Sequence, residues 1–288
     1  MAKDLYENYA EIRELYGIAN EILGFDLAGI CFNGPEEDLR QTKVTQPAIF
    51  VHSVALCEFV KKKAVSPNMV AGHSLGEYSA LYSTGVVNFA DGLRLVKLRA
   101  ELMQKAGEIN KGAMAAIIGL DADTLHAICS EASKAGIVKV ANFNSPIQLV
   151  ISGSVAGVEK AMEIAREKGA KKVVPLVVGG AFHSPLMDYA VNGFKAGLSE
   201  TAFRKTVAPI YSNVTARPVT EPNELRELLL QQLTSPVRWV ELVNKMINDG
   251  AANFFEIGPG TVLTGLVKRI NKAVSCQAIN SLESLSLI

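Results

Sequence analysis

One segment constrains the fold of this chain more than any other. A short apolar run, Met69 to Ala71, leads into Gly-His-Ser-Leu-Gly at residues 72–76, and a helix-compatible stretch, Glu77 to Ser83, follows at once. This is the G-x-S-x-G pattern in a strand–turn–helix setting, which places a serine hydroxyl at the tip of a tight turn. We expect glycine to be needed on both sides of Ser74. The strained serine backbone leaves no room for a neighbouring Cβ, and the helix must pass close to the strand.

The same segment predicts a nucleophile. The hydroxyl of Ser74 would be exposed, and the backbone N–H of Leu75, at the helix N-terminus, would point to where an oxyanion forms. The alternative is a serine that caps a glycine-rich helix start. Because G-x-S-x-G alone is common by chance, the flanking strand and helix are what favour the nucleophile.

The composition excludes several other classes of protein. Of 288 residues, 49% are hydrophobic and 20% are charged, which is typical of a globular chain. Lys and Arg together number 29, as do Asp and Glu, so the zero net charge does not indicate a nucleic-acid partner. No apolar stretch is long enough for a membrane span, and residues 1–13 are too polar for a signal peptide. We therefore expect a cytoplasmic protein without a membrane or nucleic-acid partner.

The cysteines give no framework for the fold. They stand far apart and form no C-x-x-C pair: Cys31, Cys57, Cys129 and Cys276. Neither a disulfide scaffold nor a zinc site is indicated. We expect mostly buried thiols in a reducing compartment, and we expect no metal ion or cofactor.

The pattern of elements changes between residues 112 and 178. The expected strands are 114–118, 138–141, 148–152 and 172–178, and the expected helices are 121–134 and 155–168. Their order, β-α-β-β-α-β, is that of the split βαβ unit. We therefore predict an α/β fold in which residues 111–178 form a small subdomain. It would be inserted into a large subdomain built from residues 1–110 and 179–288.

The larger part is also expected to contain helices and strands. The expected helices are 6–23, 36–39, 48–63, 77–83, 89–106, 221–232, 240–249 and 262–271, and the expected strands are 69–71, 209–214 and 253–257. We expect Pro47 at the start of its helix, where proline is tolerated, and the strand at 253–257 to be buried. The glycine-rich turn at 258–260 fits no phosphate-binding fingerprint, so we favour close helix–strand packing there.

Arg99 lies on the apolar face of the helix expected at 89–106. Its neighbours at three or four residues' distance are all apolar: Leu95, Val96, Leu102 and Met103. An arginine directed inward is almost never left unpaired. The spacing is equally consistent with two partners, a carboxylate from another element or a ligand carboxylate that the guanidinium grips bidentately.

His183 is the best candidate for a general base among the four histidines. It follows the Gly179-Gly180 turn and precedes a helix, and a serine nucleophile needs a nearby base. His52 and His126 fall in expected helices, and the side chain of His73 points away from that of the adjacent serine. Because no aspartate is an obvious third member, a backbone carbonyl could orient the histidine instead. The alternative is a structural loop histidine.

Five motifs occur together and in order. They are Gly72-His73-Ser74-Leu75-Gly76-Glu77-Tyr78, Arg99 in Val-Lys-Leu-Arg, Asn142-Phe143-Asn144-Ser145-Pro146, Gly180-Ala181-Phe182-His183-Ser184 and Glu256-Ile257-Gly258-Pro259-Gly260. Through these motifs the chain resembles the malonyl-CoA:acyl-carrier-protein transacylases of fatty-acid biosynthesis over nearly its whole length. The resemblance implies an α/β-hydrolase-like large subdomain with a parallel sheet, a ferredoxin-like small subdomain, and an active site in the cleft between them.

The resemblance also assigns the chemistry. Ser74 would attack the malonyl thioester while His183 takes its proton, and coenzyme A would leave behind a malonyl-serine ester. The phosphopantetheine thiol of acyl carrier protein would then attack that ester in a ping-pong scheme. In the family a backbone carbonyl orients the histidine, and here it would be that of Ser235. Arg99 would hold the malonyl carboxylate.

Further residues would bind the substrate by the same resemblance: Gln46, His73, Met103, Asn142, Asn144 and Phe182. The bulk of Phe182 would crowd an α-methyl group and so favour malonyl over methylmalonyl units. The implied partners are malonyl-CoA and the acidic acyl carrier protein, and we expect a monomer. Candidates for a basic docking surface, each of which could equally be solvated surface, are Lys171, Lys172, Lys268 and Arg269.

The chain departs from the family pattern at its start. Members begin with an apolar strand and a Gly-Gln-Gly-Ser/Ala-Gln segment, and Met1 to Tyr6 align just after it. The strand would belong inside the parallel sheet. The glutamine would supply the second oxyanion donor, and removal of such a donor typically costs about 10²–10³ in rate. We therefore expect a truncated and weakened form of an active transacylase.

Two functions of other classes stay open. One is a serine esterase or thioesterase, which has no use for an inward arginine, so Arg99→Ala should spare its activity. The other is a catalytically impaired remnant that binds carrier protein and is never acylated at Ser74.

Overall fold

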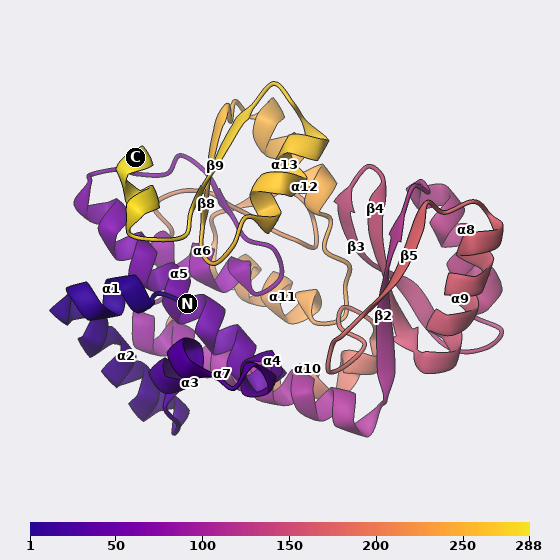
Figure 1. Cartoon of the computed structure of the whole chain (residues 1–288), viewed down its shortest axis with the longest axis horizontal. Helices are drawn as coiled ribbons and strands as arrows, with labels where there is room; N and C mark the ends of the chain where they lie inside the picture. The colour runs from indigo at the N-terminus through magenta and orange to yellow at the C-terminus, as the bar shows by residue number, and fades with distance from the viewer.

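The computed structural model describes residues 1–288, apart from the side chain of Leu287. Figure 1 shows two parts: one holds both ends of the chain, and beside it lies a smaller unit of strands β2 to β5 with helices α8 and α9. Four helices open the chain: α1 (Lys3–Asn8), α2 (Ala10–Leu23), α3 (Leu27–Asn33) and α4 (Glu36–Arg40). The helix expected at 6–23 is broken at Tyr9, whose backbone is extended, and α3 was not predicted.

Helix α5 (Thr42–Lys62) runs through the core of the larger part. It begins six residues before the predicted start at 48, so Pro47 lies inside the helix. The carbonyl of Gln41 accepts from the N–H groups of Val44 and Thr45, which extends the helix on its N-terminal side. The start was misplaced because proline favours the first helical position but does not require it.

The larger part is completed by helices around short strands. Its other helices are α6 (Gly76–Ser83), α7 (Phe89–Ile109), α10 (Asp188–Glu200), α11 (Pro222–Gln232), α12 (Trp239–Asn248) and α13 (Val262–Ile270), with 3₁₀ turns η1 (Pro185–Met187) and η2 (Glu283–Leu287). Helices α2, α5, α7 and α10 share one apolar core, in which residues such as Phe50, Leu93 and Phe194 are fully buried.

The strands of the larger part form two small sheets rather than the one parallel sheet expected. Strand β1 (Val70–Ala71) is parallel to β6 (Ile210–Tyr211), which pairs antiparallel with β7 (Pro218–Val219). Strand β8 (Asn253–Ile257) is parallel to β9 (Ser275–Ile279). Strands β1 and β6 are only two residues long, because β1 leads into the serine loop and β6 into a turn in which the Ser212 N–H donates to the Arg217 carbonyl.

Strand β8 has the predicted bounds but is not buried as expected. Phe255 on this strand is 42% exposed. The glycine-rich turn that follows does pack closely, because a Cβ on Gly258 would lie 2.8 Å from Oγ of Ser53 on α5.

The smaller unit has the predicted element order. It comprises β2 (Gly112–Ile118), α8 (Ala122–Ala132), β3 (Val138–Ser145), β4 (Gln148–Ser154), α9 (Val155–Glu167) and β5 (Lys172–Leu176). The strands form one antiparallel sheet in the order β3-β4-β2-β5. Asp121 and Ser154 cap the two helices with their side-chain oxygens, and the helices share an apolar cluster with the sheet.

The two parts are joined by backbone hydrogen bonds beside the serine loop. The N–H of Phe143 donates to the carbonyl of Val237 (2.9 Å), and the N–H of Val237 donates to the carbonyl of Ala141 (2.8 Å). The segment between α11 and α12 therefore continues the edge of the β3–β4 sheet, which holds β3 close to the start of α12.

In the part of the chain that the structure describes, no single helix is long and apolar enough to cross a membrane. The bent pair α2 and α3 passes that test by length and composition, with an angle of 114° between the two helices.

Candidate active site

Ser74 adopts the strained conformation that the G-x-S-x-G pattern predicts. Its φ is +51°, in the left-handed region that non-glycine residues rarely occupy. The preceding glycine is required sterically, because a Cβ on Gly72 would lie 1.8 Å from the carbonyl carbon of Gly76. The expectation for the second glycine was wrong: a Cβ on Gly76 would meet nothing within 4 Å among the described residues. Gly72 thus lies close to the backbone atoms of Gly76, whereas no described residue fills the position that a Gly76 side chain would occupy.

Ser74 and His183 form a hydrogen-bonded dyad. Oγ of Ser74 lies 2.8 Å from Nε2 of His183, and Nδ1 of His183 lies 2.9 Å from the carbonyl oxygen of Gln232. Because a carbonyl can only accept, Nδ1 carries the hydrogen and Nε2 is free to accept from the serine hydroxyl. This is the arrangement of a nucleophile with its base.

The carbonyl that orients His183 was assigned to the wrong residue. Ser235 was expected, and it makes only a weaker backbone interaction with the histidine; Nδ1 of His183 donates its hydrogen bond to the carbonyl of Gln232. Gln232 is the last residue of α11, and the last carbonyls of a helix have no intrahelical partner. The negative end of the helix dipole would also favour a positive charge on this ring.

His183 is held in place by close backbone packing. It also has a positive φ, +58°, and it follows a loop that crosses α7 at Gly107. A Cβ on Gly107 would lie 2.1 Å from the carbonyl oxygen of Gly179, so only glycine allows this approach. Burial and the charge of Arg99 lower the pKa of His183 to about 3. The imidazole is therefore neutral at pH 7 and able to accept a proton.

Arg99 points inward, as predicted, and is 1% exposed. Its Nη1 donates to Oε1 of Gln46 (2.5 Å), and its Nη2 donates to Oε1 of Gln232 (2.9 Å) and to Oγ of Ser74 (3.0 Å). The salt bridges found among the described residues do not include Arg99. Two of its nitrogens therefore donate to amide and hydroxyl oxygens at Ser74, Gln46 and Gln232, its Nε has no partner among the described residues, and the ion pair considered from the sequence is not formed.

Gln46 and Met103 line the same corner. Gln46, on α5, is buried, and its amide nitrogen donates to the sulfur of Met103 at 3.6 Å. Met103 lies one turn after Arg99 on α7 and is 1% exposed. The structure thus places Gln46 directly on the guanidinium of Arg99 and Met103 behind Gln46.

The smaller unit contributes the opposite side of the site. Nε2 of His73 lies 2.8 Å from Oδ1 of Asn144 on β3, and the His73 ring packs on Trp239, with ring centroids 5.4 Å apart. As predicted, this histidine is engaged away from Ser74. Asn142, on the same strand, is 6% exposed. Phe182, next to the base, packs against an apolar cluster of β2, β3 and β4.

The backbone N–H of Leu75, predicted to meet an oxyanion, has no partner in the described part of the chain. The N–H groups on either side, those of Ser74 and Gly76, are both engaged. Leu75 lies at the N-cap of α6, where the helix dipole favours negative charge.

Three buried residues around the dyad were not predicted as a group: Glu77, Asn213 and Gln232. Oδ1 of Asn213 accepts from the Ser74 N–H (2.7 Å), and the amide of Gln232 donates to the Ser74 carbonyl (3.0 Å). Glu77 accepts from both the Asn213 N–H and the Gln232 amide. A polar residue after a strand, or at a helix end, is too common a pattern to have singled them out.

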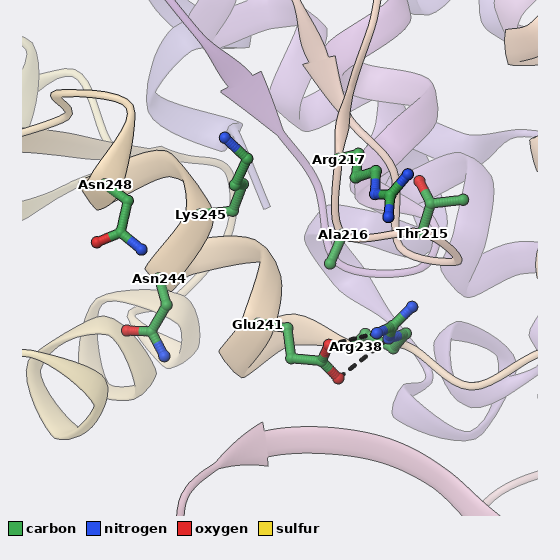
Figure 2. A pocket seen from close by; sticks show the side chains of 8 residues that line it. All are labelled: Thr215, Ala216, Arg217, Arg238, Glu241, Asn244, Lys245 and Asn248. Carbon is green, nitrogen blue, oxygen red and sulfur yellow. Dashed lines mark hydrogen bonds and ion pairs between the residues drawn. The ribbon is translucent and has the colours of Figure 1, made fainter.

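A surface hollow of about 690 Å³ adjoins the Asn213 turn and contains none of the predicted site residues (Figure 2). It lies between α12 and residues 215–217, and Arg238 in it forms an ion pair with Glu241. Among the described residues no group of three or more His, Cys, Asp or Glu side chains is arranged to hold a metal ion.

The chain matches known proteins along its whole length. The model of the acyl transferase domain family matches residues 1–285. The chain belongs to this family. It is therefore an acyltransferase.

The similar proteins are named for one activity. The malonyl CoA-acyl carrier protein transacylase of Bacillus subtilis is 42% identical over 288 residues, which cover 100% of this chain and 91% of that protein. The protein of the same name in Escherichia coli K12 is 40% identical, with coverage of 97% and 91%.

Solved structures show the same similarity. An acyl carrier protein S-malonyltransferase from Vibrio cholerae superimposes with a TM-score of 0.95 at 42% identity, covering 100% of this chain and 94% of that one. A malonyl-transacylase solved in complex with its type II polyketide acyl-carrier protein gives a TM-score of 0.96 at 40% identity, with coverage of 99% and 93%.

Proposed function

We propose that this chain transfers the malonyl group from malonyl-CoA to the phosphopantetheine thiol of an acyl carrier protein, through a malonyl ester on Ser74. The observation that carries the proposal is the buried guanidinium of Arg99, 3.0 Å from Oγ of a serine that is itself bonded to a neutral histidine. A cation beside the nucleophile suits an acyl group that ends in a carboxylate. The relatives named for malonyl transfer support the same substrate.

In the first step, His183 acts as the base. Its Nε2 takes the proton of Ser74 as Oγ bonds to the thioester carbonyl carbon, and the oxyanion is met by the N–H of Leu75. The carbon–sulfur bond then breaks, and His183 gives the proton to the leaving thiolate of coenzyme A. The carbonyl of Gln232 stabilises the imidazolium between these events.

In the second step, the roles reverse. His183 takes the proton of the phosphopantetheine thiol, the sulfur attacks the ester carbonyl, and Oγ of Ser74 leaves with the proton returned by the histidine. Arg99 holds the malonyl carboxylate throughout, with Gln46 behind it. His73, Asn142, Asn144 and Phe182 border the acyl chain from the other side.

The carrier protein would dock on basic residues that span both parts of the chain. Lys172 and Gln148 both pair with Ile118 in the sheet, from its two sides. The side chain of Gln148 accepts a hydrogen bond from Arg269 of α13 at 2.8 Å, which connects Lys172 of the smaller unit to Arg269 of the larger part. Lys171 and Lys268 are their chain neighbours, and all four cations are exposed. An acidic partner would be attracted to such a surface.

The architecture supports the same function. Residues 1–110 and 179–288 would form an α/β-hydrolase-like subdomain that carries the dyad. Residues 111–178, with the sheet order β3-β4-β2-β5, would form a ferredoxin-like subdomain over it. We expect the protein to work as a monomer in the cytoplasm.

A two-stage transfer tests the proposal. The chain is incubated with malonyl-CoA, and unreacted malonyl-CoA and free coenzyme A are removed. The malonyl-enzyme is then mixed with holo carrier protein. We expect the malonyl group to appear on the carrier thiol in amounts equal to the loss from the enzyme. A serine esterase would instead release free malonate at the same rate with or without carrier protein, and a carrier-binding remnant would take up no malonyl group at all.

A further inference from the structure

Glu77 is a buried carboxylate that the mechanism above does not use. It lies three residues after Ser74, in the first turn of α6, and is 4% exposed. The salt bridges of the described residues do not include it. Burying a carboxyl group without an ion pair is costly, so its hydrogen bonds indicate what it does.

Both oxygens of Glu77 accept from groups that hold the catalytic machinery. Oε1 accepts from the N–H of Asn213 at 2.9 Å, and Oε2 accepts from the side-chain amide of Gln232. Asn213 in turn binds both sides of the serine turn, with Oδ1 on the Ser74 N–H and Nδ2 on the Gly72 carbonyl, each at 2.7 Å.

Gln232 connects the same carboxylate to three catalytic groups. Its amide nitrogen binds the carbonyl of Ser74, its amide oxygen binds Nη2 of Arg99, and its backbone carbonyl binds Nδ1 of His183. The side chain of Gln232 therefore contacts the residues that carry the nucleophile and the cation, and its backbone holds the base.

We propose that Glu77 is a positioning residue for malonyl transfer. Through Asn213 and Gln232 it holds Ser74 in its left-handed conformation, and through Gln232 it sets the amide direction that Arg99 requires. The inference rests on the proposed function of the same site. Glu77 touches neither substrate nor reacting atoms, so its effect is on alignment alone.

The hydrogen-bond pattern requires two acceptors at position 77. Both facing groups, the Asn213 N–H and the Gln232 NH₂, are donors. A glutamine at position 77 has nearly the same shape, but its own NH₂ must face one of these donors. The two facing NH₂ groups can be separated most easily by rotation of the Gln232 amide. That rotation would turn an NH₂ group toward Arg99 and remove the hydrogen bond between Arg99 and Gln232.

Protonation of Glu77 removes an acceptor in the same way. Burial raises the pKa of Glu77 to about 7, against the hydrogen bonds from Asn213 and Gln232 and the charge of Arg99 on α7. The other titratable groups nearby are Tyr78 on the same helix, whose pKa burial raises, and His183 and His73, whose pKa values burial lowers, that of His183 to about 3. A loss of activity near pH 7 would thus come from Glu77 rather than from its neighbours.

The test compares Glu77→Gln with Glu101→Gln, an exposed carboxylate on the helix that carries Arg99. The rate of Ser74 malonylation at saturating malonyl-CoA is followed by rapid quench and intact mass at pH 8. We expect Glu77→Gln to lower this rate by up to about 10²-fold and to raise the KM for malonyl-CoA, because misplacement of a catalytic group by about 1 Å can cost that much. Glu101→Gln should match the wild type, and both variants should keep their melting temperature within a few degrees.

The pH profile supplies a readout that a merely structural role would not move. The wild-type malonylation rate should fall as pH drops through about 7 and level off near the Glu77→Gln rate, whereas the variant should show no such step. A folded Glu77→Gln that malonylates at the wild-type rate overturns the inference. If the variant does not fold, a wild-type rate that stays flat from pH 8 to 5 overturns it. Absence of a malonyl adduct on the wild type would instead refute the proposed function.

Discussion

The two glycines around Ser74 make unequal demands, and Gly72→Ala and Gly76→Ala separate them. A Cβ on Gly72 would lie 1.8, 2.0 and 2.3 Å from the C and O of Gly76 and the N of Glu77, all of them backbone atoms. Ordinary contact begins at 3.4 Å, so the start of α6 must move by about 1.6 Å. A Cβ on Gly76 meets nothing within 4 Å in the described part of the chain.

The two substitutions should therefore have opposite effects on the acylation rate and on stability. Moving α6 by that distance shifts Leu75 and Glu77 away from Ser74, and misplacement by about 1 Å can cost 10²-fold in rate. Overpacking adds a stability loss of about 1–3 kcal/mol. For Gly76→Ala, the alanine restricts the unfolded chain and suits a helix, so we expect unchanged acylation and a gain of up to about 1 kcal/mol.

The assay is the single-turnover malonylation rate together with the midpoint of urea unfolding for both variants. We expect Gly72→Ala to lose at least about 10²-fold in rate and to unfold at lower urea. Equal losses in the two variants would refute the reasoning, because they would mean that the pattern needs glycine for flexibility and not for a single close approach.

Three further outcomes are expected. Arg99→Ala should lower kcat/KM for malonyl-CoA by about 10²-fold but not that for acetyl-CoA, which has no carboxylate; equal losses for both thioesters would contradict the role of Arg99. His52 is buried, and burial lowers its pKa to about 4. Below about pH 6.5 His52 is therefore protonated in the unfolded chain but not in the native state. The free energy of unfolding should then be about 2 kcal/mol lower at pH 5 than at pH 7.5. The melting temperature of His52→Leu should therefore rise relative to the wild type between pH 7.5 and 5, and a constant difference would contradict this. The double variant Lys172→Glu, Arg269→Glu should raise the KM for carrier protein but not for malonyl-CoA, and each of its single variants is compared with Lys134→Glu, an exposed lysine outside this surface; no change relative to that control would argue against the docking surface.

The parts of the site that were predicted from the sequence are those encoded by local pattern. The elbow at Ser74 follows from the glycine spacing, and the inward direction of Arg99 follows from its apolar neighbours at helical spacing. The smaller unit was found because alternating short strands and capped helices, such as the one that begins after Asp121, carry their own signals. Each of these features depends on residues close together in the chain.

The parts that were missed depend on contacts between distant segments. Whether the carbonyl of Gln232 or that of Ser235 faces His183 depends on where α11 ends relative to the loop after β5, which no local pattern encodes. The same holds for Asn213 and Glu77, which are separated by 136 residues. The extent of the sheets was also misjudged, because β1 and β6 are shortened by the turns that follow them rather than by their own composition.

The most direct test of the account is the mass of the intact chain after mixing with malonyl-CoA, beside a Ser74→Ala control, with peptide mapping of any adduct. We predict that the parent gains one malonyl group, mapped to Ser74, and that the control gains none. A parent that gains no malonyl group, or a control that gains it as readily, would contradict the account.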